Sequence, residues 1–259
     1  MVVGTQPDKH SRASPCFFLL AARRGLPLSQ KGKISKCLFS MPLRALRAAG
    51  LAPRLISPPS RGHVYQLPAL LSPDIADQCF DFFCTRFDGW KTETDAFGLQ
   101  QRATAYFGDD GAVFSYVGLT LKPKAWPDAL AAARERADLV AAAHGTRMTA
   151  CLTNHYGEGA SSIPFHSDEV RAHGESKLVL SVSLGGQRRM LLRHKGAGAA
   201  PSPVLALSLP AGSAVAMAGE AQQHWEHALP IDSHAPRRVS LTFRSIVPGF
   251  EVGRPPAPP

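Results

Sequence analysis

Two stretches of the chain carry side chains that could bind a metal ion. The first, NHYGEGASSIPFHSD, covers residues 154–168, and the second, HWEHALP, covers residues 224–230. His166 and Asp168 are two residues apart, so in a strand their imidazole and carboxylate would project from the same face toward one ion. A further histidine would complete the two-histidine, one-carboxylate triad that binds non-haem Fe(II) with coordination positions left open. On this tripeptide alone, an ordinary pair of surface residues is the simpler interpretation.

Residues 237–245, RRVSLTFRS, alternate between polar and apolar side chains. One face carries Arg238, Ser240, Thr242 and Arg244, and the other carries Val239, Leu241 and Phe243. The alternation predicts a half-buried strand with an arginine at each end of its polar face. If that face lines a cavity, the guanidinium groups suit bidentate capture of a carboxylate; the alternative is a solvated face. Asn154 and Tyr156, also two apart, would face the same cavity from a neighbouring strand.

Together, N-x-Y, H-x-D, the histidine before Ala-Leu-Pro and R-x-x-L-T-F-R resemble the AlkB family of Fe(II)/2-oxoglutarate dioxygenases over residues 63–250. The resemblance is greatest to the members that repair alkylated nucleic acid. It implies that Fe(II) is bound by His166, Asp168 and His227. His224 competes for the third position, but the family pattern places the ligand just before the small residue and Leu-Pro. The resemblance further implies that 2-oxoglutarate is bound by Asn154, Tyr156, Arg238, Thr242 and Arg244.

Residues 90–126 correspond to the nucleotide-recognition lid of these proteins. By position, the resemblance implies substrate contacts from Arg102, Phe114, Ser115, Tyr116 and Glu169. Tyr116 would stack on the base, with the His166 ring on its other side, and Phe97 would fill the gap that a flipped base leaves. The alternative is that Phe114 and Tyr116 are ordinary core aromatics.

The implied activity is oxidative dealkylation of N-alkylated bases, of the 1-methyladenine and 3-methylcytosine type, in DNA or RNA. It uses Fe(II), 2-oxoglutarate and O2 and releases succinate, CO2 and formaldehyde. The metal and the cosubstrate carry the difficult chemistry, and the protein supplies geometry. Two alternatives stay open: a 2-oxoglutarate-dependent hydroxylase or demethylase acting on protein or small molecules, and a nucleic-acid binder without catalysis.

The pattern of helices and short strands predicts an α+β fold with a double-stranded β-helix (jelly-roll) core and flanking helices. The resemblance adds the nucleotide-recognition lid. Ser72-Pro73-Asp74 marks the start of one helix, and a second helix is expected over 127–143. The inward positions of the first are Ile75, Cys79, Phe82 and Phe83, and those of the second are Leu130, Ala133 and Val140. Short strands follow within 149–156, 177–185, 188–194, 204–210, 213–218 and 237–247.

Basic side chains gather at residues 188–195, where Arg188, Arg189, Arg193 and Lys195 lie on one hairpin. They predict either an edge that contacts phosphates or a solvated hairpin. The net charge of +9 is otherwise concentrated in residues 1–62, which hold 11 Lys and Arg against one acidic residue. The remaining 197 residues hold 18 basic and 19 acidic side chains, so their charge is close to neutral.

The charge distribution sets apart a basic extension (1–62). The resemblance implies a dioxygenase domain (63–250), and a Pro-rich tail (251–259) follows it. Three interpretations of the extension stay open: a transit peptide, a disordered arm near polyanions, or a segment that precedes the true start at Met41.

Five cysteines without CxxC spacing indicate reduced thiols in an intracellular protein, cytoplasmic in a bacterium and nuclear or organellar in a eukaryote. No apolar run reaches the roughly 18 residues of a membrane span. We expect a monomer whose partner is DNA or RNA carrying alkylated bases, with no obligate protein partner.

Overall fold

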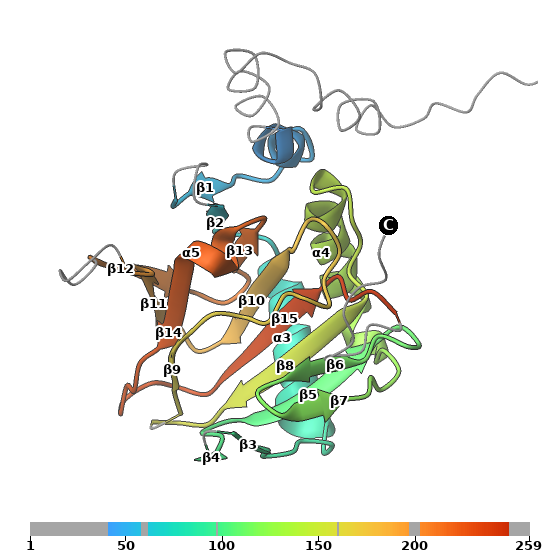
Figure 1. Ribbon diagram of the computed structural model, residues 1–259. Helices are drawn as coiled ribbons and strands as arrows, with labels where there is room; N and C mark the ends of the chain where they lie inside the picture. Colours follow the sequence, from blue (N-terminus) through green and yellow to red (C-terminus); the bar gives the residue numbers. More distant parts are fainter. Residues whose placement is uncertain (1–40, 58–61, 97, 160, 197–202, 249–259) are drawn as a thin grey trace, which may run out of the picture. The chain divides into compact units, whose positions relative to one another are not determined.

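The computed structural model describes residues 41–57, 62–96, 98–159, 161–196 and 203–248. Phe97, the Pro-rich tail and residues 1–40 and 58–61 of the basic extension lie outside these ranges. A large antiparallel sheet crosses the folded unit (Figure 1). Across this sheet the strands follow the order β1 (Arg54–Leu55), β2 (His63–Leu67), β13 (Ala214–Ala218), β10 (Val179–Gly185), β15 (Arg238–Arg244), β8 (Ala150–Tyr156) and β5 (Ala103–Gly108).

A smaller antiparallel sheet packs beside the large one. Its strands follow the order β12 (Val204–Leu209), β11 (Arg188–His194), β14 (Trp225–Leu229) and β9 (Ile163–His166). Apolar side chains of both sheets form one cluster, in which Val215 and Met217 of β13 meet Met190, Leu192 and Leu229. The two antiparallel sheets fit the predicted jelly-roll. Within the described residues they do not close into a barrel.

The two predicted helices are present and cover one face of the large sheet (Figure 1). Helix α3 (Pro73–Asp81) begins after Ser72, whose hydroxyl accepts the Ile75 N–H at 3.4 Å, and continues into a π-helical turn, Phe82–Arg86. The segment 127–143 forms a 3-10 turn, Asp128–Leu130, followed by α4 (Ala131–Ala143). The inward positions expected for this segment, Leu130, Ala133 and Val140, are fully buried.

Residues 90–126, which are predicted to form a lid, are not a single element. The segment Ala103–Gly108 is strand β5, which pairs with β8 in the large sheet, so this part of 90–126 belongs to the scaffold. The rest contains two small hairpins, β3 (Thr94–Asp95) with β4 (Gly98–Leu99), and β6 (Phe114–Tyr116) with β7 (Leu119–Leu121). Residues 104–108 of β5 are buried, which is typical of a scaffold strand.

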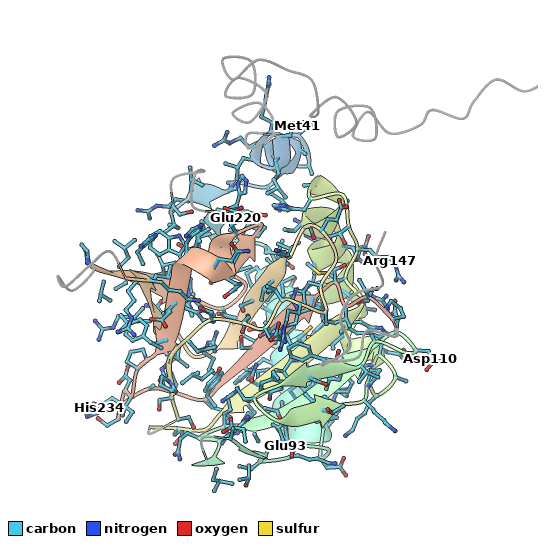
Figure 2. The ribbon with its side chains drawn as sticks, in the orientation of Figure 1. Met41, Glu93, Asp110, Arg147, Glu220 and His234 are labelled. Atoms are coloured by element: carbon cyan, nitrogen blue, oxygen red, sulfur yellow. The ribbon has the colours of Figure 1, made fainter. Side chains whose placement is uncertain are left out.

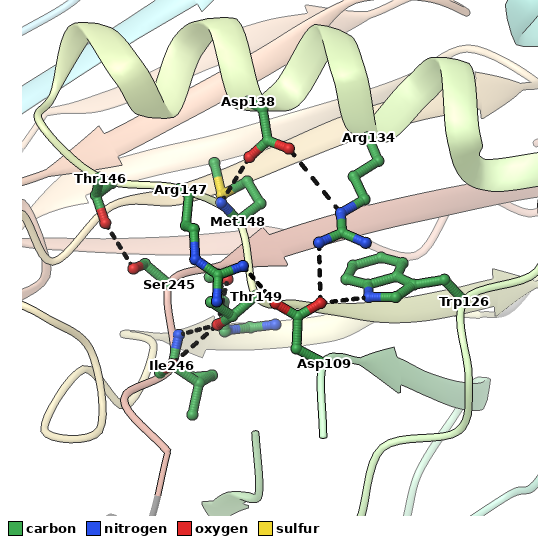
Figure 3. A network of polar contacts seen from close by, with 11 residues as sticks. Asp109, Trp126, Arg134, Asp138, Thr146, Arg147, Met148, Thr149, Ser245 and Ile246 are labelled. Atoms are coloured by element: carbon green, nitrogen blue, oxygen red, sulfur yellow. Dashed lines mark hydrogen bonds and ion pairs between the residues drawn. The ribbon is translucent and has the colours of Figure 1, made fainter. Parts of the chain in front are cut away.

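The turn after β5 is fixed by a polar network around Asp109 (Figure 3). Its carboxylate accepts hydrogen bonds from Trp126 Nε1 and Arg134 Nη2, both at 2.9 Å, and from Arg147 Nη1. These partners come from the chain before α4, from α4 itself and from the segment before β8. One carboxylate therefore ties the edge of the large sheet to the helix that covers it.

Part of the predicted extension, residues 41–57, belongs to the folded unit. Residues 41–48 are helical, and Leu46 and Leu51 are buried in the main core. Strand β1 adds to the sheet by pairing with β2. These apolar side chains, embedded in a basic segment, are what join residues 41–57 to the fold. Among the described residues, no helix has the length and apolar character needed to cross a bilayer.

Candidate metal centre

Two histidines face each other across neighbouring strands of the smaller sheet. His166 ends β9, and its direct partner in the pairing with β14 is His227; their ring centroids are 4.3 Å apart. Asp168 completes the group, since one ligand atom from each of the three side chains lies within 4.8 Å of the others. His224, the competing candidate, lies outside this group, with its Nε2 3.5 Å from Glu220. The geometry therefore favours His227.

Asp168 does not reach the group in the way that its spacing predicts. Strand β9 ends at His166, so the two residues do not share a strand face. The chain leaves the strand because other partners take its polar groups: Ser167 Oγ donates to the carbonyl of Trp225 at 2.9 Å, and the Asp168 N–H donates to Gln222 Oε1 at 2.8 Å. The predicted proximity is present, but tertiary hydrogen bonds produce it.

The electrostatics of the group suit a divalent cation. His166 Nδ1 lies 2.9 Å from the carbonyl of Pro164, which can only accept, so Nδ1 is the donor of this contact, and Nε2 lies 3.7 Å from Asp168 Oδ1. Burial and the neighbouring His166 lower the pKa of His227 to about 4, so its ring is neutral at neutral pH. Burial raises the pKa of Asp168, but Arg244, His227 and His166 outweigh it and bring the pKa down to about 2. Two imidazoles and a carboxylate form the donor set that binds non-haem Fe(II).

Beside this group lies strand β15, which begins with Arg238 and ends with Arg244. All seven residues of the strand are buried, so the prediction of a half-buried strand is wrong: the main core covers Val239, Leu241 and Phe243, and a cavity wall holds the polar side chains. Arg244 Nη2 lies 3.5 Å from Asp168 Oδ2. Strand β8 supplies the facing residues, with Tyr156 opposite Arg238.

Arg238 is a buried cation without a carboxylate partner among the described residues. It is 2% exposed, donates from Nη2 to Ser183 Oγ at 2.9 Å and lies over the Tyr156 ring, 5.1 Å from its centroid. In the described part of the chain, no carboxylate lies within ion-pair distance of it. Burial lowers the pKa of Arg238, and an unpaired buried charge is costly. The residues present therefore fit an anionic ligand such as the carboxylate of 2-oxoglutarate.

One cavity of about 770 Å³ joins these features. Its walls include His166, Asp168 and His227. They also include all five residues predicted for the cosubstrate: Asn154, Tyr156, Arg238, Thr242 and Arg244. Four of the five residues predicted for the substrate also line it: Arg102, Phe114, Tyr116 and Glu169. The fifth, Ser115, does not line it; its hydroxyl hydrogen-bonds Thr120 across the β6–β7 hairpin at 3.0 Å.

The aromatic pair Phe114 and Tyr116 lines the cavity that also holds the His166–Asp168–His227 group. Phe114 and Tyr116 stack with centroids 5.2 Å apart, and the Arg244 guanidinium lies 4.8 Å from the centroid of the Phe114 ring. Phe114 is 1% exposed and belongs to an apolar cluster, as the core interpretation expects, while it also lines the cavity. Tyr116 is only half-buried, which leaves its ring accessible from the cavity.

Two of the predicted substrate residues already have partners in the protein. Arg102 Nε donates to Asn154 Oδ1 at 2.8 Å, so this arginine contacts a predicted cosubstrate residue. Glu169 accepts from Arg171 Nη2 at 2.8 Å and from Nε at 3.0 Å. Burial raises the pKa of Glu169, but the hydrogen bonds from Arg171 outweigh it, so the carboxyl stays ionised.

Three of the four basic residues predicted at 188–195 contact other parts of the protein, while Arg189 is exposed. Arg188 is 2% exposed and donates from Nη2 to the carbonyls of Ser161 and Pro230 at 3.0 and 2.7 Å. Arg193 pairs with Glu226 at 2.8 Å, and Lys195 Nζ donates to the carbonyl of Gln222 at 2.8 Å. Contacts within the protein therefore occupy Arg188, Arg193 and Lys195, and strand β11 lies inside the smaller sheet rather than at its edge.

The sequence gives little indication of the remaining cavity residues. Ser240 belongs to the predicted polar face and lines the cavity without having been singled out for a role. Gln100, Ser181 and Gln222 also line it. They come from three separate segments, and no spacing or motif links them to the histidines.

Comparison with known proteins places these observations in context. A family model described as the 2OG-Fe(II) oxygenase superfamily matches residues 87–244. The chain is 38% identical over 153 residues to the DNA oxidative demethylase ALKBH2 of Bos taurus, covering 57% of this chain and 54% of that protein. It is 36% identical over 171 residues to ALKBH2 of Mus musculus, covering 62% and 70%.

A more distant relative is the alpha-ketoglutarate-dependent dioxygenase alkB homolog 3 of Homo sapiens, 26% identical over 221 residues, covering 79% of this chain and 73% of that protein. Among solved structures, that of OsALKBH1 is 16% identical with a TM-score of 0.48, covering 75% of this chain and 100% of the other. The match to the bovine protein spans only about half of that relative's length.

Proposed function

Because the chain belongs to the 2OG-Fe(II) oxygenase superfamily and, within it, to the AlkB family, we propose that it is an oxidative nucleic-acid dealkylase. It removes alkyl groups from N-alkylated bases of the 1-methyladenine and 3-methylcytosine type in DNA or RNA. The relatives named DNA oxidative demethylase support this substrate class.

The observation that carries the proposal is one cavity that joins a His166–Asp168–His227 group to a buried arginine without a carboxylate partner among the described residues. The three side chains would hold Fe(II). Arg238 would pair with one carboxylate of 2-oxoglutarate, and Arg244, which already approaches Asp168, would lie beside the metal. When bound, Fe(II), 2-oxoglutarate and O2 would supply the oxidation that yields succinate, CO2 and formaldehyde.

The protein's own residues orient these groups. Asn154, hydrogen-bonded to Arg102 and 3.5 Å from Thr242 Oγ1, would present its amide to the cosubstrate. Arg238 is 2% exposed, and the low dielectric of a buried site strengthens each charged contact there. No side chain has to act as a general base, since the proton and electron balance lies with the metal and the cosubstrate.

The two hairpins β3–β4 and β6–β7 would form the nucleotide-recognition lid. Tyr116 would stack on the base, with the His166 ring on its other side, which recovers part of the stacking lost when a base leaves its helix. A hydroxylase of proteins or small molecules would not need this aromatic pair at the cavity. Because Phe114 and Tyr116 line it, a base is the favoured substrate.

The protein is proposed to act inside the cell as a monomer. Cys79, Cys84 and Cys151 are free thiols, which supports a reducing compartment.

The deciding experiment measures formaldehyde and succinate release from a 1-methyladenine oligonucleotide with Fe(II) and 2-oxoglutarate. Single- and double-stranded forms are compared, beside a His166→Ala variant. We expect repair that is lost in the variant. Succinate release without repair would exclude this substrate, and no turnover by protein that binds iron would favour the hydroxylase of proteins or small molecules.

A further inference from the structure

Gln222 is a buried side chain whose amide is fixed between two partners. It lies in the short helix α5 (Ala221–His224), which follows Glu220, labelled in Figure 2, and it is 4% exposed. Its Oε1 accepts the backbone N–H of Asp168 at 2.8 Å, and its Nε2 lies 3.4 Å from Met217 Sδ. Since a peptide N–H only donates, the atom that faces Asp168 must be the oxygen, which settles the orientation of the amide.

Asp168 needs such a partner because the sheet does not hold it. Strand β9 ends at His166, so ladder hydrogen bonds stop two residues earlier. Beyond that point, the backbone is tied by Ser167, whose hydroxyl donates to the carbonyl of Trp225, and by the Asp168–Gln222 bond. Arg244 touches only the carboxylate, which the proposed metal would share. The direction of the Asp168 side chain is therefore set largely by residues 222–225.

The same segment also leads directly to His227. Helix α5 ends at His224, and β14 starts at Trp225, two residues before the histidine. Lys195 fixes this junction from the other side: its Nζ donates to the carbonyl of Gln222 at 2.8 Å, and its backbone N–H donates to that of His224 at 2.7 Å. The junction thus links the loop of Asp168 to the strand of His227.

We infer that Gln222 is a positioning residue for the metal centre: through its amide oxygen it holds the backbone of Asp168 so that the carboxylate meets His166 and His227. The inference rests on the proposed metal site. Its role differs from that of a ligand, because its amide oxygen contacts the backbone N–H of Asp168. Partners that orient metal ligands typically contribute about 10- to 100-fold in metal affinity.

The test uses Mn²⁺ as the probe, with its dissociation constant measured by calorimetry on the full chain, in the absence of any nucleic acid. Wild type and His227→Ala first establish whether the site binds metal. Gln222→Met keeps the length of the side chain but removes the acceptor, and we expect Mn²⁺ binding weaker by about 10- to 100-fold. The matched control is Gln78→Met, the same change at an exposed position of α3 that does not line the cavity, and it should leave the dissociation constant unchanged.

Gln222→Glu separates positioning from packing, since a carboxylate oxygen can still accept the Asp168 N–H. It should bind Mn²⁺ more tightly than Gln222→Met does. If Gln222→Met fails to unfold cooperatively on heating, Gln222→Asn replaces it, because the shorter amide stays polar but no longer reaches Asp168. Wild-type affinity in a folded Met or Asn variant would overturn the inference, as would equal losses in Glu and Met. Absence of His227-dependent Mn²⁺ binding in the wild type would instead remove the proposed metal site itself.

Discussion

Arg238 gives the sharpest prediction, because removing it should weaken ligand binding without weakening the fold. Arg238→Met replaces a buried cation by an apolar chain of similar length. Replacing buried charge with apolar volume is often neutral or stabilising by about 1–4 kcal/mol. At about 2–4 °C per kcal/mol for a chain of this size, the variant without ligand should melt at or above the wild-type temperature.

Binding of 2-oxoglutarate should respond in the opposite direction. Loss of one partner of a buried charge pair costs about 2–5 kcal/mol, which is about 30- to 4000-fold in the dissociation constant. A ligand at 100 times its dissociation constant stabilises the folded state by about 2.7 kcal/mol, so 2-oxoglutarate with Mn²⁺ should raise the wild-type melting temperature by about 5–11 °C. At the same concentration, Arg238→Met should show less than about a third of that shift.

Arg188 provides a control matched in residue type and burial, since each arginine is 2% exposed. Arg188, however, donates to two backbone carbonyls, which Arg188→Met would leave unsatisfied, at about 1–3 kcal/mol each. It should therefore lower the melting temperature and keep the response to 2-oxoglutarate. The reasoning would be refuted if Arg238→Met destabilised the ligand-free protein as much as Arg188→Met, or if it kept the full ligand-induced shift.

Three further predictions follow from other contacts. Tyr116→Ala should raise the KM for an alkylated oligonucleotide about 5- to 150-fold, the equivalent of about 1–3 kcal/mol of base stacking, while succinate release without substrate persists. Arg102→Met should raise the KM for 2-oxoglutarate severalfold, because Asn154 loses the donor at 2.8 Å that orients its amide. Asp109→Asn should lower the free energy of unfolding by about 1–3 kcal/mol, because Trp126 and two arginines lose their ionised acceptor; urea denaturation measures the change.

The Asp109 prediction includes a pH dependence. Burial raises the pKa of Asp109, but hydrogen bonds from Trp126 and Arg147 and the charge of Arg134 outweigh it, so its pKa lies below the ordinary value. Its contribution is therefore present above the unfolded pKa of about 4 and is lost as the pH falls through the folded pKa. The stability difference between wild type and Asp109→Asn should shrink in that acidic range. A difference independent of pH would contradict this account.

Controls for the other two variants lie nearby. Ser115→Ala changes the neighbour of Tyr116 that does not line the cavity, and it should leave the KM for the oligonucleotide unchanged. Lys91→Met changes an exposed side chain beside Thr104 that does not line the cavity, and it should leave the KM for 2-oxoglutarate unchanged. Equal effects in a variant and its control would contradict the assigned contact.

Local sequence patterns predicted the helices and strands well, because side-chain periodicity and capping residues depend on neighbours in the chain. The cap at Ser72, the inward positions of the helix over 127–143 and the strands after residue 149 follow from side-chain periodicity and turn chemistry, and they are confirmed. The alternation in β15 likewise identified which side chains share a face. It did not show that both faces are covered, because burial depends on the second sheet and on the helices.

The sequence by itself determined which residues could form the site: the histidines, Asp168 and the strand with two arginines are visible as types and spacings. Tertiary structure alone decided how they meet. Asp168 leaves its strand because Gln222, more than 50 residues away, accepts its N–H. Arg188 and Arg238 look alike in sequence, yet one donates to backbone carbonyls and the other lines the cavity without a carboxylate partner in the described chain. The partners of a buried polar group come from distant segments, and no local spacing specifies them.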